Sequence, residues 1–441
     1  MQEEARRFYI ETLGCQMNIY DSEIISAMLL ADGYILADGP ADADLILLNT
    51  CSVRDRAERK ALSMAAQFAS LRKERPGLII GIIGCMAQRL GEKLTEGGNI
   101  DLVVGTDCYD YFTELLRRLE IRGGPVVETS CNFVSNYTLR PETYSSIKAF
   151  VSIMRGCNNF CSYCIVPYVR GRERSKEHEA ILAEINNLAG LGVKEVTLLG
   201  QNVNSYEDGN VDFAGLLAMV NDVDLIERVR FTTSHPKDLT DDLIFAMRDL
   251  DRVCEHLHLP IQSGNDRILQ AMSRGYTLAE YRSRHDFARA QVPNLAVTTD
   301  VMVGFPSETD AEYEDTLAAF RDLRFDAAFM FRYSVREGTR AADLGDDVAE
   351  EVKIERLKRL IALQNDITDS RKQELLGRTV EVLVEEPSAK EPGYMLGRTR
   401  ENWLAKIPSK GVRQGSKVNA EVTSVTRWML TCAGVQGKAE A

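Results

Sequence analysis

Residues 155–167 read RGCNNFCSYCIVP and carry three cysteines in a C-x3-C-x2-C pattern, Cys157, Cys161 and Cys164. An apolar run over 150–154 comes directly before them and predicts a strand, so all three thiols share one loop at a strand end. Three thiols on one short loop cannot all pair as disulfides, and in a reducing compartment they indicate a metal site.

The spacing favours an iron–sulfur cluster over zinc. Zinc usually takes a fourth ligand from a second pair of matching spacing. Here the closest histidine is His178, beyond a charged stretch, and no further cysteine follows until Cys254. Three thiolates fit a 4Fe–4S cluster with one iron left open, which can chelate a ligand and pass it an electron. The alternative, three incidental buried thiols, has far less support.

The sequence that follows this loop alternates strand and helix patterns. Further strands are predicted over 195–200, 229–234, 257–262, 297–304 and 328–334. Helical patterns lie between them, for example over 178–188, 241–249 and 310–323, and a charged helical segment over 348–376 closes the block. Six strand–helix units in one stretch predict a part-barrel of parallel strands, (β/α)6 in form.

The two ends of the chain differ in character. The first 125 residues alternate helical segments with apolar runs at 8–12, 44–48 and 78–83, which predicts an open parallel α/β domain. The last 65 residues hold five short strand patterns, over 379–385, 394–399, 403–407, 417–426 and 428–433. Such a series predicts a small antiparallel β-barrel of the oligonucleotide-binding type. We therefore expect domains over 1–125, 147–376 and 377–441, with a linker over 126–146.

The composition excludes several classes of protein. With 44% hydrophobic and 27% charged residues, the 441-residue chain is not a wholly disordered one. No apolar run approaches the ~18 residues that a membrane helix needs, and the N-terminus lacks the apolar core of a signal peptide. We expect a cytoplasmic protein without a membrane partner and, in solution, a monomer.

The charge is unevenly distributed along the chain. The net charge of -13 argues against one large nucleic-acid-binding surface. Residues 377–441 carry +3, however, against -16 for the remainder. The tail alone has the sign that a polyanion partner needs, although a merely solvated surface explains the same excess about as well.

A second set of cysteines is scattered in sequence but ordered by the predicted fold. Cys15, Cys51 and Cys85 each follow a predicted strand, at separations of 36 and 34 residues, about one strand–helix unit. In a parallel sheet the carboxyl ends of the strands meet at one edge, so the three thiols project together and predict a second cluster. Three ordinary buried cysteines are the alternative. The other four are interpreted as small hydrophobes: Cys108, Cys131, Cys254 and Cys432.

The C-x3-C-x2-C motif resembles that of the radical S-adenosylmethionine (SAM) superfamily. GCQMNIYDSE at 14–23, NTCSVRDRAERK at 49–60 and GCMAQR at 84–89 look like the N-terminal domain of the methylthiotransferases, and the tail resembles the RNA-binding TRAM domain. The resemblance to the methylthiotransferase family of radical SAM enzymes covers essentially the whole chain in the family's order. GCQMN and NTCSVR look most like the branch that makes 2-methylthio-N6-dimethylallyladenosine in tRNA.

This resemblance implies cofactors and a reaction. It implies two 4Fe–4S clusters, an auxiliary one at Cys15, Cys51 and Cys85 and a SAM-cleaving one at Cys157, Cys161 and Cys164. It implies two molecules of SAM, one as methyl donor and one as radical source, and transfer to C2 of N6-dimethylallyladenosine at position 37 of tRNA. The partners implied are that tRNA and an electron donor of unknown identity.

Three alternatives stay open. Two are branches of the same family, acting on threonylcarbamoyl-adenosine in tRNA, with GCKVN in place of GCQMN, or on a ribosomal-protein aspartate, with GCPKN. The third, more remote, is a non-catalytic iron–sulfur RNA-binding protein.

Further cofactor contacts are expected at the carboxyl ends of the barrel strands. The superfamily often has a Gly-Gly-Glu-like turn after the second strand, but this chain has Gly200-Gln201-Asn202. Gln201, Gln262 and Asp300 are our candidates for contacts with SAM or substrate, and each could equally close a turn at a strand end. His256 and His258 share a strand face, and we expect packing or a pocket contact rather than a metal.

Basic residues at two places are candidates for RNA contacts. One group follows the cysteine loop directly, Arg170, Arg172 and Arg174. The other lies in the tail, Arg398, Arg400, Trp403, Arg413 and Lys417, with Trp428 also available for stacking on a base. A solubilising surface is the alternative for any one of them.

Overall fold

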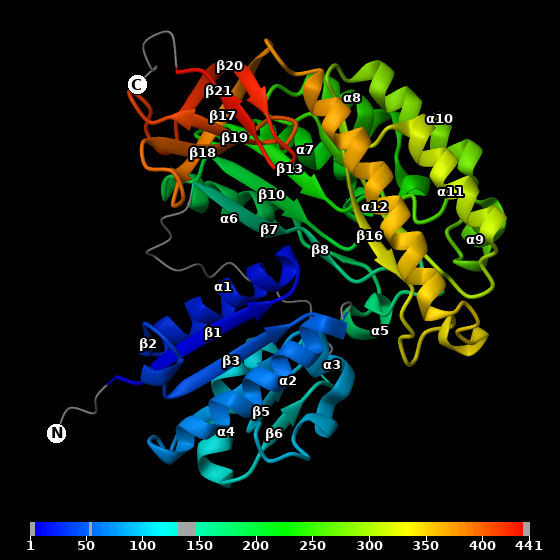
Figure 1. Ribbon diagram of the computed structural model, residues 1–441. Helices are drawn as coiled ribbons and strands as arrows, with labels where there is room; N and C mark the ends of the chain where they lie inside the picture. The colour runs from blue at the N-terminus through cyan, green and yellow to red at the C-terminus, as the bar shows by residue number, and fades with distance from the viewer. Residues whose placement is uncertain (1–4, 53–54, 131–146, 435–441) are drawn as a thin grey trace.

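The computed structural model describes residues 5–52, 55–130 and 147–434 (Figure 1). The N-terminal domain is a six-stranded parallel sheet in the order β2-β1-β3-β4-β5-β6. Its strands are β1 (Arg7–Leu13), β2 (Ile35–Leu36), β3 (Leu45–Thr50), β4 (Ile79–Ile83), β5 (Leu102–Val104) and β6 (Val126–Glu128). Its helices are α1 (Gln16–Ala31), α2 (Asp55–Ala69), α3 (Cys85–Leu90) and α4 (Phe112–Arg122). The predicted open parallel α/β domain is confirmed.

Apolar side chains fill both faces of this sheet. Every residue of β3 is buried, as expected for a central parallel strand with helices on both sides. One core lies between the sheet and helices α1 and α4, and the other between the sheet and helices α2 and α3. The packing therefore fixes the carboxyl ends of the strands along one edge of the sheet. The cysteines of this domain come directly after those strand ends.

The linker was predicted to begin at residue 126, and this boundary was wrong. Residues 126–128 form β6 and pair in parallel with β5, Val126 opposite Leu102. Gly123, at φ +67°, ends α4 in a left-handed turn, and the strand after it is too short to show any periodicity. The N-terminal domain therefore extends to at least Glu128. Residues 131–146 lie outside the described residues.

The central domain is the expected part-barrel of six parallel strands. The strands are β7 (Lys148–Ser152), β10 (Glu195–Leu199), β13 (Arg228–Thr232), β14 (His256–His258), β15 (Ala296–Val303) and β16 (Ala327–Arg332). They pair as β7-β10-β13 and β14-β15-β16, and a parallel bridge from Val229 to Val253 links the two halves.

The covering helices of the central domain are α6 (His178–Gly190), α7 (Phe213–Asn221), α8 (Asp241–Asp249), α9 (Asp266–Ala271), α10 (Leu278–Gln291), α11 (Asp310–Leu323) and α12 (Glu350–Gln373). Short elements flank the cysteine loop and β10: β8 (Met154–Arg155), α5 (Val166–Arg170), β9 (Arg174–Ser175), β11 (Glu207–Asp208) and β12 (Val211–Asp212). Helices α10 and α11 begin at capping boxes, in which Thr277 pairs with Glu280 and Thr309 with Glu312. The local sequence therefore determines where these two helices begin.

The tail folds into a closed five-stranded barrel in the order β17-β18-β19-β21-β20. Its strands are β17 (Thr379–Pro387), β18 (Tyr394–Thr399), β19 (Leu404–Pro408), β20 (Lys417–Val425) and β21 (Leu430–Cys432). Buried and exposed residues alternate along β18 and β20, and the buried set forms one core. The predicted small barrel is confirmed, except that β19 and β21 pair in parallel rather than antiparallel.

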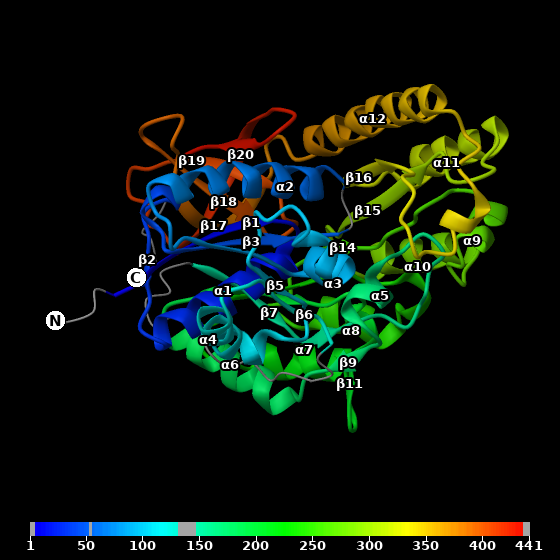
Figure 2. The ribbon, with the colours of Figure 1, turned by 90° about the horizontal axis from the view of Figure 1, so that it is seen from below.

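The N-terminal sheet lies on one side of the part-barrel, with α1 beside β7 (Figures 1 and 2). Leu199 and Phe150 of the central domain join the N-terminal core there. The long helix α12 runs along β16 and leads into the tail barrel. None of the described helices combines the length and the apolar character that crossing a membrane requires.

Gly397 of β18 offers a test of the tail's packing. A Cβ added there would collide with the backbone oxygen of Leu383 on the neighbouring strand. We expect Gly397→Ala to lower the free energy of unfolding of the barrel by about 1–3 kcal/mol, because an extra carbon in a closed barrel displaces the backbone. Calorimetry of the full chain measures this. Gly434→Ala, where nothing lies within 4 Å of the added carbon, is the matched control and should leave the transition unchanged.

Candidate metal centres and RNA interface

The three scattered cysteines lie at the carboxyl ends of three neighbouring strands. Cys15 precedes α1 at the end of β1, Cys51 follows β3 directly, and Cys85 opens α3 after β4. Because β1, β3 and β4 are adjacent in the sheet, their thiols come together. The Cys51 thiol, by hydrogen bonding, and Arg170, by its charge, lower the pKa of Cys15 to about 6. We call these three cysteines the N-terminal triad.

A pair of buried asparagines holds this edge of the sheet, and sequence analysis missed it. Asn18 donates to the Oδ1 of Asn49 at 2.8 Å, and Asn49 donates back to the backbone oxygen of Asn18 at 2.8 Å. The Oδ1 of Asn18 also accepts from the backbone N–H of Cys15 at 3.2 Å. Gly84, at φ +93°, leaves room for this pair, since a Cβ there would lie 2.5 Å from the Oδ1 of Asn49. The sequence did contain a signal for this pair, because Asn18 in GCQMN and Asn49 in NTC are polar residues next to the cysteines.

The cysteines of the loop after β7 and β8 form the central triad, Cys157, Cys161 and Cys164. Gly156, at φ +81°, passes so close to the backbone of Arg172 that only glycine fits before Cys157. The backbone N–H of Gly156 donates to the Oε1 of Gln201 at 2.6 Å, so the residue after β10 supports the cysteine loop. Burial raises the pKa of the Cys164 thiol to about 12.

The donor sets fit iron–sulfur clusters better than single metal ions. A single zinc ion bound at 2.3 Å needs sulfur atoms about 3.8 Å apart. Among the described residues, the one group of three ligand-type side chains with donor atoms within 4.8 Å of one another is His178, Glu179 and Asp208. In neither triad, therefore, do all three sulfurs lie as close together as a single zinc ion requires, although the thiols of Cys15 and Cys51 are in hydrogen-bonding contact.

Each triad also receives a buried guanidinium. The Nη1 of Arg274 donates to the Sγ of Cys161 at 3.3 Å, and the Nε of Arg170 donates to the Sγ of Cys85 at 3.2 Å. Both arginines are almost fully buried, at 5% and 3% exposed. Cationic donors beside thiol sulfurs suit thiolate ligands of an anionic cluster.

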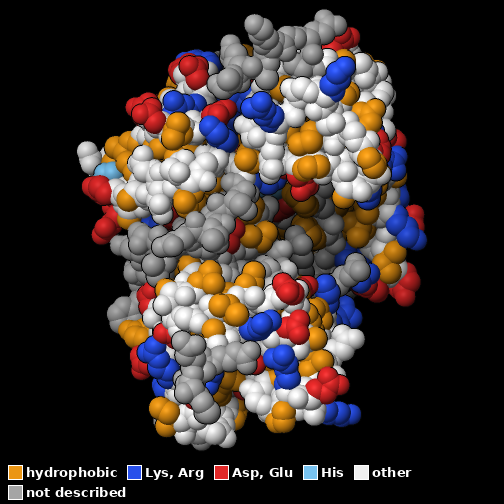
Figure 3. Space-filling model, turned by 90° about the vertical axis from the view of Figure 1, so that its left-hand side faces the viewer, with side chains coloured by type: hydrophobic (Ala, Val, Ile, Leu, Met, Phe, Trp, Pro, Cys, Tyr) orange, Lys and Arg blue, Asp and Glu red, His pale blue; other side chains and the backbone are white. Residues whose placement is uncertain are grey.

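The segment that follows the central triad packs on the N-terminal triad. Ile165, directly after Cys164, and Val169 of helix α5 pack against Cys85. Arg336, which follows β16 of the central domain, also lies near the N-terminal triad. Its guanidinium is close enough to Cys51 for their charges to interact. On the face shown in Figure 3 the surface is hollowed between the N-terminal domain and the rest of the molecule.

The predicted SAM or substrate contacts lie at the carboxyl side of the barrel strands. Gln201 is half-buried and bonded to the cysteine loop. Gln262 is buried at φ +66°, and its backbone pairs with Asp300 and Met302 of β15. The half-buried carboxylate of Asp300 lies 3.5 Å from the Nε2 of His258. The Nδ1 of His258 in turn lies 3.0 Å from the hydroxyl of Thr298.

The structure corrects the assignment of Arg170 to RNA binding. Its guanidinium is buried between Asp21 and Cys85, and at 3% exposed it is out of reach of an RNA phosphate in solvent. Arg174 is half-buried and pairs with Asp107 of the N-terminal domain at 2.8 Å. Arg172 is exposed, with its guanidinium 5.4 Å from the centre of the Phe160 ring, and it remains available.

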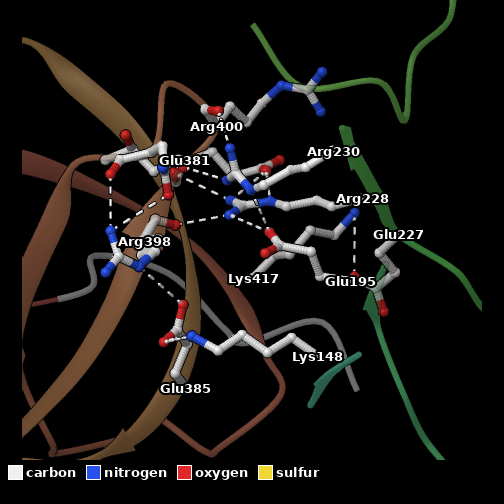
Figure 4. Close-up of polar contacts among 12 residues, drawn as sticks. Lys148, Glu195, Glu227, Arg228, Arg230, Glu381, Glu385, Arg398, Arg400 and Lys417 are labelled. Carbon is white, nitrogen blue, oxygen red and sulfur yellow. Dashed lines mark hydrogen bonds and ion pairs between the residues drawn. The ribbon is translucent and has the colours of Figure 1, made fainter. Parts of the chain in front are cut away.

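Two side chains of the predicted RNA set, Arg400 and Lys417, dock the barrel onto the central domain, and a third, Arg398, pairs within the barrel (Figure 4). Arg400 donates to both carboxylate oxygens of Glu255, at 2.7 and 2.8 Å. Lys417 lies 3.3 Å from Glu227, and Arg398 lies 3.8 Å from Glu385 of its own barrel. The charges of Arg400 and Lys417 therefore face acidic residues of the central domain rather than solvent alone.

Two buried arginines of β13 complete this contact. Arg228 donates to the backbone oxygen of Arg398 at 2.7 Å and to the carboxylate of Glu381 at 2.8 Å. Arg230 donates to the backbone oxygens of Thr399 and Arg400 at 2.7 Å. Since β7, β10 and β13 begin here, the barrel docks at the amino ends of the central strands, opposite the cysteine loop.

The remaining tail candidates differ in exposure. Trp403 is half-buried, with the Nζ of Lys372 5.1 Å from its ring centre. Arg413 is exposed, and Trp428 is 77% exposed, so both can meet a ligand from solvent. Of the other cysteines, Cys254 and Cys432 are buried and free, as expected of small hydrophobes. Cys108 is disulfide-bonded, so that interpretation was wrong for it, and Cys131 lies outside the described residues.

Three family models match consecutive parts of the chain. The uncharacterized protein family UPF0004 matches residues 7–105, the radical SAM superfamily matches 151–320, and the TRAM domain matches 373–432.

Full-length relatives carry a common name, tRNA-2-methylthio-N(6)-dimethylallyladenosine synthase. The one from Thermoanaerobacter sp. (strain X514) is 45% identical, with 96% of this chain and 91% of the relative covered. The one from Clostridium novyi (strain NT) is 44% identical, with 97% and 96% covered. The one from Porphyromonas gingivalis (strain ATCC BAA-308 / W83) is 45% identical, with 95% and 93% covered.

Solved structures share the fold at low identity. The radical S-adenosylmethionine methyltransferase TsrM from Kitasatospora setae, with cobalamin and a [4Fe-4S] cluster bound, superposes with a TM-score of 0.59 at 12% identity, covering 77% of this chain and 74% of that one. The cobalamin-dependent S-adenosylmethionine radical enzyme OxsB superposes with a TM-score of 0.54 at 12% identity, covering 81% and 56%.

Arg230 tests the docking of the tail. Arg230→Met removes the donor to two backbone oxygens and leaves the buried carboxylate of Glu195, 2.9 Å away, without that partner. We expect a loss of about 3–5 kcal/mol of stability and faster proteolysis between α12 and β17. Limited proteolysis and denaturant unfolding measure both. Lys148→Met, which breaks the pair between the half-exposed Lys148 and Glu385, is the control and should cost less than about 1 kcal/mol. Equal effects of the two substitutions would contradict this account.

Proposed function

We propose that this chain, which belongs to the family of tRNA-2-methylthio-N(6)-dimethylallyladenosine synthases, adds a methylthio group to C2 of N6-dimethylallyladenosine at position 37 of tRNA. It is a radical SAM transferase that uses two 4Fe–4S clusters and two molecules of SAM, one as methyl donor and one as radical source. The observation that carries the proposal is that the segment directly after one cysteine triad packs on a cysteine of the other, across the interface of two domains.

The proposed assignment of the cysteines follows their positions. Cys157, Cys161 and Cys164 hold the SAM-cleaving cluster, on the loop at the carboxyl side of the barrel. Cys15, Cys51 and Cys85 hold the auxiliary cluster. When bound, the two clusters and SAM supply the electron, the methyl group and the sulfur that no side chain of this protein can provide.

The protein's own residues fix the geometry between these sites. Helix α5, which follows the central triad, packs against Cys85, and Gln201 accepts a hydrogen bond from Gly156 at the start of the cysteine loop. Asp300 presents a half-buried carboxylate at the same side of the barrel, which suits a cationic amino group of SAM. Gln262 offers an amide there. The burial of the interface keeps water away from reactive species.

For the tRNA, we propose contacts at the basic and aromatic residues that remain exposed. Arg172 beside the cysteine loop and Arg413 and Trp428 in the tail are the strongest of these. The tail docks at the amino ends of the barrel strands and the triads lie at the carboxyl ends, so a bound RNA must reach around the central domain. We further propose that the chain acts as a monomer in the cytoplasm, where tRNA is found, with an external one-electron donor.

One anaerobic experiment tests the proposed function. The reconstituted chain should bind about eight irons and, with SAM, a reductant and isopentenylated tRNA, release 5′-deoxyadenosine and form the methylthio nucleoside. Mass spectrometry of the digested tRNA detects the product. The triple variant Cys15→Ala, Cys51→Ala, Cys85→Ala should bind about four irons and still cleave SAM but form no methylthio product. Binding of about four irons by both proteins would contradict the two-cluster assignment. Modification of threonylcarbamoyl-adenosine instead would identify another branch of the family.

Trp428 tests the tail's contact with RNA. We expect Trp428→Ala to raise the Kd for tRNA by about 5- to 150-fold, because base stacking on an aromatic side chain contributes about 1–3 kcal/mol. Arg413→Ala should weaken binding and reduce the salt dependence of log K by about one phosphate contact. Filter binding over a range of salt concentrations measures both. Leu344→Ala, at an exposed apolar residue of the central domain, is the control. Unchanged affinity in both tail variants would exclude these contacts.

A further inference from the structure

Arg170 connects the two domains at the N-terminal triad. It ends α5, 6 residues after Cys164, and only 3% of it is exposed. Its Nε donates to the Sγ of Cys85 at 3.2 Å, and its Nη2 donates to the Oδ2 of Asp21 at 2.8 Å. Asp21 lies on α1 and is fully buried. A guanidinium of the central domain is thus inserted between a carboxylate and a cysteine of the N-terminal domain.

The surroundings leave Arg170 with capacity for a further anion. Its Nη1 is buried and has no hydrogen-bond partner among the described residues. Its carboxylate partner is shared, because the other oxygen of Asp21 accepts from Arg155 at 3.0 Å. An unsatisfied buried donor is unfavourable, and more so when it is charged, so such a site is completed by an acceptor. The sulfurs of an anionic cluster on Cys85 supply that acceptor.

We propose that Arg170 is a positioning residue for the auxiliary cluster, holding Cys85 against the domain interface and raising the reduction potential of the cluster through its N–H···S hydrogen bond. The inference rests on the proposed function, since it needs a cluster on the N-terminal triad. Reduction adds one electron and one negative charge to the cluster. A cationic donor stabilises the more negative form, so its presence favours reduction.

The corresponding arginine of the central triad has a different setting. Arg274 also donates to a cysteine sulfur, but its remaining N–H groups bond to Tyr276, Tyr163 and the backbone oxygen of Pro260, all within its own domain. Arg170 alone of the two couples a cysteine of one domain to a helix of the other. Its removal should therefore change both the cluster's potential and the contact between domains.

The test uses the full chain with Cys157, Cys161 and Cys164 changed to alanine, so that the auxiliary cluster is the one observed. Iron and sulfide are counted after anaerobic reconstitution, and the midpoint potential is measured by a redox titration followed by electron paramagnetic resonance. Arg170→Met should shift the midpoint to more negative values, and Arg170→Lys, which keeps the charge, should shift it less. Arg174→Met is the matched control, because Arg174 also crosses to the N-terminal domain, at Asp107, but donates to no cysteine sulfur among the described residues. It should leave the midpoint unchanged.

The possible results separate the inference from the proposed function. Equal midpoints in Arg170→Met and the unsubstituted background, or equal shifts in Arg170→Met and Arg174→Met, would overturn the role of Arg170. Loss of iron in Arg170→Met with retention in Arg170→Lys and Arg174→Met would support it, whereas loss in all three would overturn it. A background that binds no iron before any arginine is changed would overturn the auxiliary cluster itself, and with it the proposed function.

Discussion

The buried contact of Asp21 with Arg155 and Arg170 is the interaction on which the arrangement of the two cysteine triads depends. Asp21 belongs to the N-terminal domain, and both arginines come from segments next to the central triad. Taking such charges out of water offsets most of their attraction, so the pair contributes little net stability. The contact instead fixes how the two domains are positioned. Any other arrangement of the domains would separate Asp21 from the two arginines and leave a buried charge without its partner. Cys85 and helix α5 meet in the observed arrangement.

A second set of polar contacts, between the tail barrel and the central domain, shows which basic residues of the barrel serve docking and which stay free for RNA. Its backbone oxygens at 398–400 accept from Arg228 and Arg230, while Arg400 and Lys417 pair with acidic residues of the central domain. Part of the tail's net charge of +3 is therefore neutralised inside the molecule. Acidic residues of the central domain thus bind part of the basic tail, and the residues of the tail that stay exposed are the ones available for RNA. Net charge alone could not distinguish these two roles.

Most of the fold and both triads could be predicted because they follow from local rules. The triads needed only strand periodicity and the rule that parallel strands end at one edge, which placed Cys15, Cys51 and Cys85 together although 70 residues separate the first from the last. Strand β6 was missed because its three residues are too few to show a period. Arg170 was assigned to RNA because basic residues are usually exposed, and its partner Asp21 lies 149 residues away in the sequence. A long-range ion pair leaves no local pattern.

The central claim is that both triads hold clusters that lie close together at the domain interface. The most direct measurement is the magnetic coupling between the two reduced clusters in the reconstituted full chain, by electron paramagnetic resonance. The account predicts a spectrum broadened by spin–spin interaction, which reverts to a single uncoupled signal when the cysteines of either triad are changed to alanine. A spectrum equal to the sum of the signals of the two single-cluster variants would contradict it.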